Sequence, residues 1–201
     1  MVKYISLGTY CLASTVLKHF NLKTESYPFD WIVSTIPSIC DIIDSNFTHF
    51  LNKKYIEEDS ENDRVYTKNK YYQNEDGSKN ITYFHHNLLT EKDYQYFERC
   101  VQRWKDVVYT SEKKYLILTT TYLDMTTPDL LNQSLINANI KNYTIVIATP
   151  LYHENETIDP IIEKINNNIY IVKLYSSESW DANLPICKGW KKLFKFLNDQ
   201  K

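Results

Sequence analysis

The chain has 201 residues, a formal net charge of −2 and a sequence pI near 6.2, and 43% of its residues are hydrophobic. This composition is typical of a globular domain and excludes a disordered chain, a collagen-like fibre or a coiled coil. No apolar run approaches the ~18 residues that a membrane span needs, and the near-zero charge argues against a nucleic-acid binder that neutralises phosphates. The N-terminus lacks the layout of a signal peptide. We therefore expect one domain, residues 1–201, in the cytoplasm (the host cytoplasm for a viral protein).

The few glycines and the spacing of the cysteines narrow the chemistry further. The three glycines are too dispersed for a phosphate-binding loop or a dinucleotide fingerprint: Gly8, Gly77 and Gly189. The cysteines form no Cys-x-x-Cys pair: Cys11, Cys40, Cys100 and Cys187. Such spacing is typical of free thiols in a reducing compartment, so we expect neither a metal site nor disulfides.

The hydrophobic pattern predicts alternating strands and helices. In the first half it predicts strand 2–7, helix 12–20, helix 36–51, strand 81–84 and helix 91–108. In the second half it predicts strands 114–119, 143–148 and 169–174, and helices 128–138, 158–165 and 188–197. The polar stretch 52–80 predicts a loop or small hairpin excursion that would serve as a lid. Continuous apolar strands between helices indicate an α/β fold with a mostly parallel central sheet flanked by helices.

Cys11 stands where the first predicted strand gives way to a helix. Open α/β sheets bind ligands at the carboxyl ends of their strands. The free N–H groups and positive potential of a helix N-terminus lower the pKa of a cysteine and stabilise an oxyanion. Gly8 permits a tight turn before it. The position therefore predicts a nucleophile at the end of the first strand; a buried thiol packed under the sheet is the alternative.

A thiol nucleophile needs a base, and His85 and His86 follow a short predicted strand. Adjacent residues on an extended segment point to opposite faces, so only one of the two would serve. The alternative is that both are surface polar residues at a strand end. A metal site formed with His153 is conceivable, but the spacing of the three residues is not diagnostic.

Several side chains could orient the imidazole. Asp30 lies among large aromatic residues, where an unpaired carboxylate is costly, so it should have a partner. A purely structural partner is an equally good explanation. The other candidates are Asn87, Asp124 and Asp181.

Two arginines and two tryptophans are candidates for binding roles. Arg99 and Arg103 stand four residues apart on one predicted helix and could clamp a phosphate or carboxylate, although a solvated helix face is the commoner explanation. Trp31 and Trp180 could provide stacking platforms for a sugar, although the core is the usual place for tryptophan.

Three sequence blocks together resemble a known family. They are ISLGTYCLAS at 5–14, SYPFDWIVS at 26–34 and YFHHN at 83–87. Ser6, Leu7, Gly8 and Cys11 match the first motif, Pro28 to Trp31 the second, and Phe84, His86 and Asn87 the third, with Asn87 where an Asp is common. The family is described as papain-like cysteine peptidases of bacteria and giant DNA viruses. The resemblance covers the first half of the chain well, and the second half only in the order of strands and helices.

This family is also similar to capsule-polysaccharide acetyltransferases that use a Cys and a His with coenzyme A. The resemblance thus implies an acetyl-CoA-dependent N- or O-acetyltransferase acting on an amino sugar or nucleotide sugar, without metal, nucleic-acid or membrane partners. The implied catalytic residues are Cys11 as nucleophile, His86 as base and Asp30 as orienting acid. The implied cofactor contacts are Gly8, Thr9, Tyr10, Arg99 and Arg103, and the implied substrate contacts are Trp31 and His85. The alternatives are a cysteine peptidase or amidohydrolase with the same residues, and a non-catalytic glycan-binding module.

Overall fold

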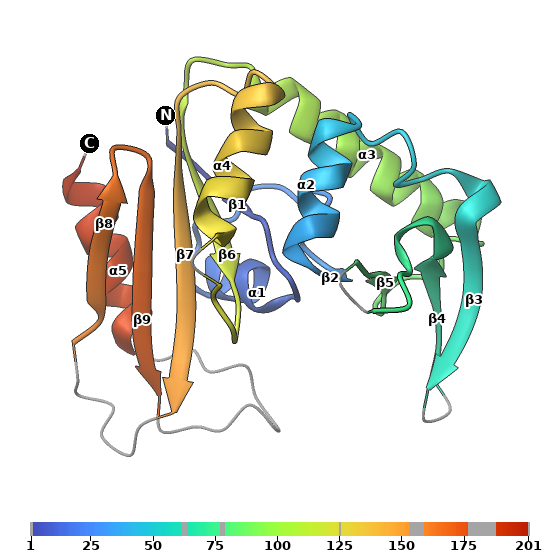
Figure 1. Cartoon of the computed structure of the whole chain (residues 1–201), viewed down its shortest axis with the longest axis horizontal. Helices are drawn as coiled ribbons and strands as arrows, with labels where there is room; N and C mark the ends of the chain where they lie inside the picture. The colour runs from blue at the N-terminus through green and yellow to red at the C-terminus, as the bar shows by residue number, and fades with distance from the viewer. Residues whose placement is uncertain are drawn as a thin grey trace.

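The computed structural model describes residues 2–61, 64–76, 79–124, 126–152, 159–176 and 188–200. Within these ranges the chain forms two sheets (Figure 1). Sheet A has the order β1-β6-β7-β9-β8 and sheet B the order β2-β5-β4-β3. The strands of sheet A are β1 (Val2–Ser6), β6 (Lys113–Thr119), β7 (Tyr143–Tyr152), β8 (Ile161–Asn166) and β9 (Ile169–Ser176). All its pairings are parallel except that between β8 and β9.

Sheet A is covered on both faces, which explains its continuous apolar strands. One face packs on α1 (Leu12–His19) and α5 (Lys188–Asp199). The other packs on α2 (Ile36–Asp44), α3 (Glu91–Val108) and α4 (Thr127–Asn137). Alternate residues of β6 serve the two cores: Leu116 and Leu118 face α2–α4, whereas Tyr115 and Ile117 face α1 and α5. The expected α/β class with a mostly parallel, helix-flanked sheet is confirmed.

Sheet B is antiparallel and consists of one strand that precedes α2 and three strands from the region between α2 and α3. It consists of β2 (Val33–Ser34), β3 (Ile56–Glu61), β4 (Arg64–Asn69) and β5 (Ile81–Tyr83). Two short 3₁₀ turns, η1 (Lys53–Tyr55) and η2 (Lys70–Tyr72), flank the β3–β4 hairpin. The segment 52–80 therefore contains a hairpin, one of the two forms expected for it, and its role as a lid stays a prediction. Figure 1 shows β2 and β5 between sheet A and this hairpin.

Two predicted helices differ from the structure. The segment 158–165 was expected to be helical, but residues 161–166 form β8, an exposed edge strand in a hairpin with β9. Its isoleucines fit a helical spacing, yet the asparagine run before β9 makes a tight turn, and short hairpin turns favour such residues. The helix expected over 36–51 ends at Asp44, because Asn46 and Phe47 adopt positive φ angles of 49° and 65°.

None of the helices in the described ranges is both long and apolar enough to cross a membrane.

Candidate active site

Cys11 lies at the start of α1, five residues after the end of β1. It is the residue preceding the helix, and its carbonyl oxygen accepts a hydrogen bond from the Thr15 N–H at 2.9 Å. Its side chain does not cap the helix and is only partly buried, whereas Cys40 and Cys100 are buried. Among the described cysteines, Cys11 is therefore the one that a reagent or substrate can reach. Cys187 lies outside the described residues.

A tight turn over residues 7–10 fixes the entry to the helix. A Cβ on Gly8 would lie 2.3 Å from the carbonyl oxygen of Tyr10, so a larger residue would force the turn to move. The Gly8 N–H donates to Ser6 Oγ at 3.2 Å, and its carbonyl accepts from Ser34 Oγ at 3.1 Å. Thr9 Oγ1 donates to the Thr119 carbonyl at 2.8 Å, which ties the turn to the end of β6.

The electrostatics of Cys11 differ from the sequence expectation. Burial raises the pKa of the Cys11 thiol above its ordinary value, and a backbone hydrogen bond lowers it by less. The lowering expected from the helix N-terminus is therefore not seen, because removal from water costs the thiolate more than the backbone contact gains. A nucleophilic role for this thiol would therefore require a base to remove its proton.

His86 contacts residues in the first two turns of α3, which begins at Glu91. Its Nδ1 lies 3.3 Å from Asp93 Oδ1. Its ring stacks on Tyr96 at 4.7 Å between centroids and meets the edge of Phe97 at 5.2 Å. In the tautomer that carries its proton on Nδ1 and donates it to Asp93, the lone pair of Nε2 is left for another proton, which is the state a general base needs.

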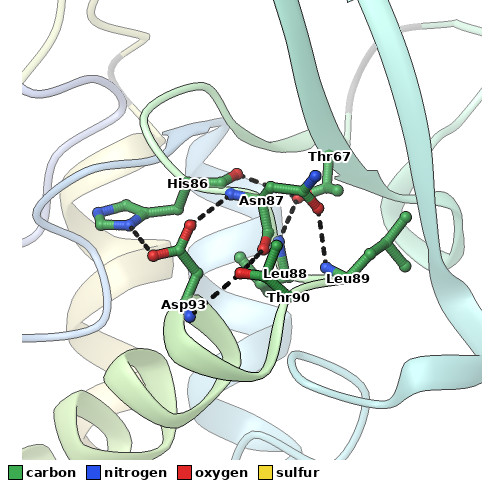
Figure 2. Close-up of polar contacts among 7 residues, drawn as sticks. All are labelled: Thr67, His86, Asn87, Leu88, Leu89, Thr90 and Asp93. Atoms are coloured by element: carbon green, nitrogen blue, oxygen red, sulfur yellow. Dashed lines mark hydrogen bonds and ion pairs between the residues drawn. The ribbon is translucent and has the colours of Figure 1, made fainter.

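Hydrogen bonds also hold the backbone on both sides of His86. The other carboxylate oxygen of Asp93 accepts the Asn87 N–H at 2.8 Å, and Thr90 Oγ1 accepts the Asp93 N–H and so caps α3 (Figure 2). From β4, Thr67 Oγ1 donates to the His86 carbonyl at 3.3 Å. One carboxylate thus joins the imidazole to a helix N-terminus, where negative charge is favoured.

Strand β2 separates the Cys11 turn from β5, which leads into the histidines. The Ser34 N–H donates to the Thr9 carbonyl at 2.8 Å, and Ser34 pairs with Ile81 across the sheet. His85 follows β5 and its ring meets the edge of Trp31 at 5.7 Å. The contacts of His86 given above are with Asp93, Tyr96 and Phe97. Catalytic contacts are often long before substrate binds.

Asp30 is buried, as expected, and has partners other than a histidine. Its Oδ2 lies 2.6 Å from Lys23 Nζ and accepts the Tyr27 N–H at 2.8 Å. Lys23 Nζ also donates to Ser14 Oγ at 2.5 Å and lies 4.7 Å from the centre of the Trp31 ring. Because Ser14 lies on α1 one turn after Cys11, this network fixes the Pro28–Trp31 block against the helix that follows Cys11. The carboxylate that lies 3.3 Å from His86 Nδ1 is that of Asp93, and the orienting role expected of Asp30 stays a prediction.

The comparison with known families bears on these same segments. A sequence model described as "Putative papain-like cysteine peptidase (DUF1796)" matches residues 2–146, which contain both the Cys11 turn and the His86–Asp93 pair. The chain belongs to this family. The matched range ends within β7, so the family's defining segments include sheet B and the first strands of sheet A.

One viral protein matches this papain-like family member over a short stretch of the chain. It is "Uncharacterized protein R408" of Acanthamoeba polyphaga mimivirus, 48% identical over 48 residues, which are 23% of this chain and 22% of that protein. The match thus spans about a fifth of the viral protein's length. No solved structure matches the chain.

A pocket of about 430 Å³, called here the α1–α3 pocket, lies beside the histidines of this family member. Its lining includes Lys18, Lys23, Glu25, Trp31, Tyr96 and Arg103. Two of the expected binding residues, Trp31 and Arg103, are thus brought together, with His85 against Trp31. Arg99 is exposed and does not line the pocket.

The remaining candidates do not join the site. Asn87 serves the turn before α3, since its Oδ1 accepts the Leu89 N–H, and Asp124 accepts the N–H of Thr126. Three candidates lie outside the described residues: His153, Trp180 and Asp181. The conceivable metal site of three histidines includes His153 and therefore also falls outside them. Elsewhere in the described ranges no three His, Cys, Asp or Glu residues are grouped as metal ligands.

Sequence reasoning missed Asp93, Tyr96 and Lys23. Asp93 carried a usable signal, because Thr90-x-x-Asp93 is a helix-capping pattern directly after the histidines. Tyr96 and Lys23 carried none, since each acts through a contact made only in the folded chain.

Proposed function

We propose that this chain is a cysteine hydrolase that works through an acyl-enzyme. Cys11 is the nucleophile, His86 the general base and Asp93 the residue that orients the imidazole. The observation that carries the proposal is the contact of His86 Nδ1 with Asp93 at 3.3 Å, on a segment one short strand away from the reachable Cys11. Membership of the papain-like family supports the same chemistry.

The reaction follows from these positions. The Cys11 sulfur attacks the carbonyl carbon of an amide or ester, and the thiol proton passes to Nε2 of His86. The first N–H groups of α1 have no acceptor within the helix and face the developing oxyanion. The bond to the leaving group breaks as His86 returns the proton to it. Water, activated by His86, then hydrolyses the thioester to give the acid and the free thiol.

The same acyl-enzyme could pass its acyl group to an amine or hydroxyl instead of water, which is the acetyl-CoA-dependent sugar acetyltransferase expected above. The cationic side chains of the α1–α3 pocket, Lys18 and Arg103, favour this second candidate because they could meet the phosphates of coenzyme A. For Gly8, Thr9 and Tyr10 the contacts that the structure shows are internal to the fold, and their role toward a cofactor stays a prediction.

A single panel of substrates distinguishes the hydrolase from the acetyltransferase. Fluorogenic peptide amides, an activated ester, and acetyl-CoA with and without amino sugars are offered to the wild type and to variants. We expect turnover of an amide or ester without any acceptor, its loss in Cys11→Ala, and a fall of about 100-fold or more in His86→Gln. His19→Gln, at an exposed position on α1, is the matched control and should keep full activity.

Other outcomes assign other functions. Release of free coenzyme A only when an amino sugar is present would identify the transferase. Undiminished turnover in Cys11→Ala would exclude the covalent route. Glycan binding without turnover of any substrate would identify the non-catalytic module.

A further inference from the structure

The α1–α3 pocket has an excess of positive charge that the fold does not use. Lys23 is compensated by the buried Asp30 carboxylate at 2.6 Å. The remaining charged side chains of its lining are Lys18 and Arg103, opposed by the single carboxylate of Glu25. The pocket therefore favours an anion.

Arg103 is prepared for such a ligand. Its Nη1 donates to the Ser26 carbonyl at 3.1 Å and contacts Cys100 Sγ at 3.7 Å, and these contacts hold the guanidinium in place. In the described part of the chain, its Nε and Nη2 groups have no hydrogen-bond partner. The Nε–H and Nη2–H groups form one edge of the planar guanidinium, and this edge matches the two oxygens of a carboxylate or phosphate.

The aromatic walls of the pocket connect it to the histidines. Tyr96 stacks on His86 at 4.7 Å, and Trp31 meets His85 at 5.7 Å. Both aromatic rings are partly exposed, so each can contact a ring of a bound molecule. A ligand in the pocket that contacts Tyr96 is thus one aromatic ring away from the proposed base.

A neighbouring hollow of about 330 Å³ shares Glu25 and Arg103 but has the opposite character. Its lining adds the carboxylates of Asp106 and Glu112 and one further cation, Lys3, so carboxylates outnumber cations and an anion is less favoured on that side. An anion bound by Arg103 is therefore better accommodated in the α1–α3 pocket than in this hollow.

We propose that the α1–α3 pocket binds an anionic group of the substrate, a carboxylate or a phosphate, on Arg103 and Lys18. An adjoining ring of the substrate packs against Trp31 or Tyr96. The proposal rests on the proposed function only in placing the substrate's reacting bond at Cys11 and His86; the binding itself needs no catalysis.

Calorimetric titration of wild type and Cys11→Ala with glucose 6-phosphate, glucuronate, inorganic phosphate and neutral glucose tests the proposal. We expect a charged sugar to bind at least about tenfold more tightly than glucose, more weakly as salt is raised. The tighter of the two charged sugars identifies phosphate or carboxylate as the preferred group. Arg103→Gln should weaken that binding about tenfold or more, whereas Arg99→Gln, one turn earlier on α3, should leave it unchanged.

Lys18→Gln provides a variant that cannot be dismissed as misfolded, because Lys18 is exposed on α1. It should weaken the charged sugars severalfold without changing the affinity for glucose. Equal affinity for charged and neutral sugars, no binding of any of them, or equal losses in Arg103→Gln and Arg99→Gln would overturn the proposal. Because binding is also measured in Cys11→Ala, failure of the pocket and failure of the proposed nucleophile give different results.

Discussion

The buried pair of Lys23 and Asp30 gives a sharp test of how the site is held together. In Asp30→Asn the amide oxygen can still accept the Tyr27 N–H, so the substitution removes the charge and little else. It leaves the Lys23 ammonium, whose side chain is only 10% exposed, with Ser14 Oγ and the face of Trp31 as partners. An unpaired buried cation is costly whether or not the intact pair is itself stabilising.

The expected loss of folding free energy follows from the burial of the Lys23 side chain. Removing one partner of a buried ion pair costs about 3–5 kcal/mol, and the retained hydrogen bonds place Asp30→Asn at the lower end, about 3 kcal/mol. For a domain of this size 1 kcal/mol changes Tm by about 2–4 °C, so Tm should fall by about 6–12 °C. The double variant Lys23→Met/Asp30→Asn removes both charges and should lose less stability than the sum of the two single variants.

Thermal unfolding followed by circular dichroism measures these differences. The matched control is Asp59→Asn, which breaks a 2.9 Å ion pair with Lys68 on the exposed hairpin and should leave Tm nearly unchanged. If Asp30→Asn unfolds at the temperature of the wild type, or if the two pairs respond alike, the Asp30 network does not anchor the Pro28–Trp31 block against α1.

Three further predictions concern the catalytic segments. Because burial raises the pKa of the Cys11 thiol, the thiolate fraction at neutral pH is small, and its alkylation by iodoacetamide should still increase with pH between pH 7 and pH 9. A plateau near pH 7 would show a preformed thiolate. Asp93→Asn should lower turnover about 100-fold or more at nearly unchanged Tm. The control Glu98→Gln, at an exposed position on the same helix, should leave activity intact, and equal activities of the two variants would remove Asp93 from the mechanism. Gly8→Ala should destabilise the fold by about 1–3 kcal/mol in denaturant unfolding, because its Cβ meets the Tyr10 carbonyl; wild-type stability would show that the turn relaxes freely.

The sequence predicted the elements that carry their own signal. The buried strands β6, β7 and β9 are continuous apolar runs, and α3 begins and ends at the expected residues because Thr90 caps it and an apolar stripe follows. The error at 158–165 arose because an exposed edge strand has no buried face to give it a two-residue period. Sheet B was missed as a unit because β2 is two residues long and its partners come from a polar region.

For the candidate site, the sequence likewise shows only those positions that carry a local signal. Cys11 and His86 stand at element boundaries that the pattern reveals. Two features of the folded chain decide between Asp30 and Asp93 as the partner of His86. A turn brings Asp93 Oδ1 within 3.3 Å of His86 Nδ1, and Asp30 instead forms an ion pair with Lys23. Spacing along the chain contains neither fact.

The central claim is that Cys11 forms the acyl-enzyme with His86 as its base. Rapid mixing of the protein with an activated acyl ester, acid quench and peptide mass analysis measures this step directly. The account predicts acylation at Cys11, at a rate reduced about 100-fold or more in His86→Gln and unchanged in His19→Gln. Acylation at another cysteine, or at Cys11 with the same rate in all three proteins, would contradict it.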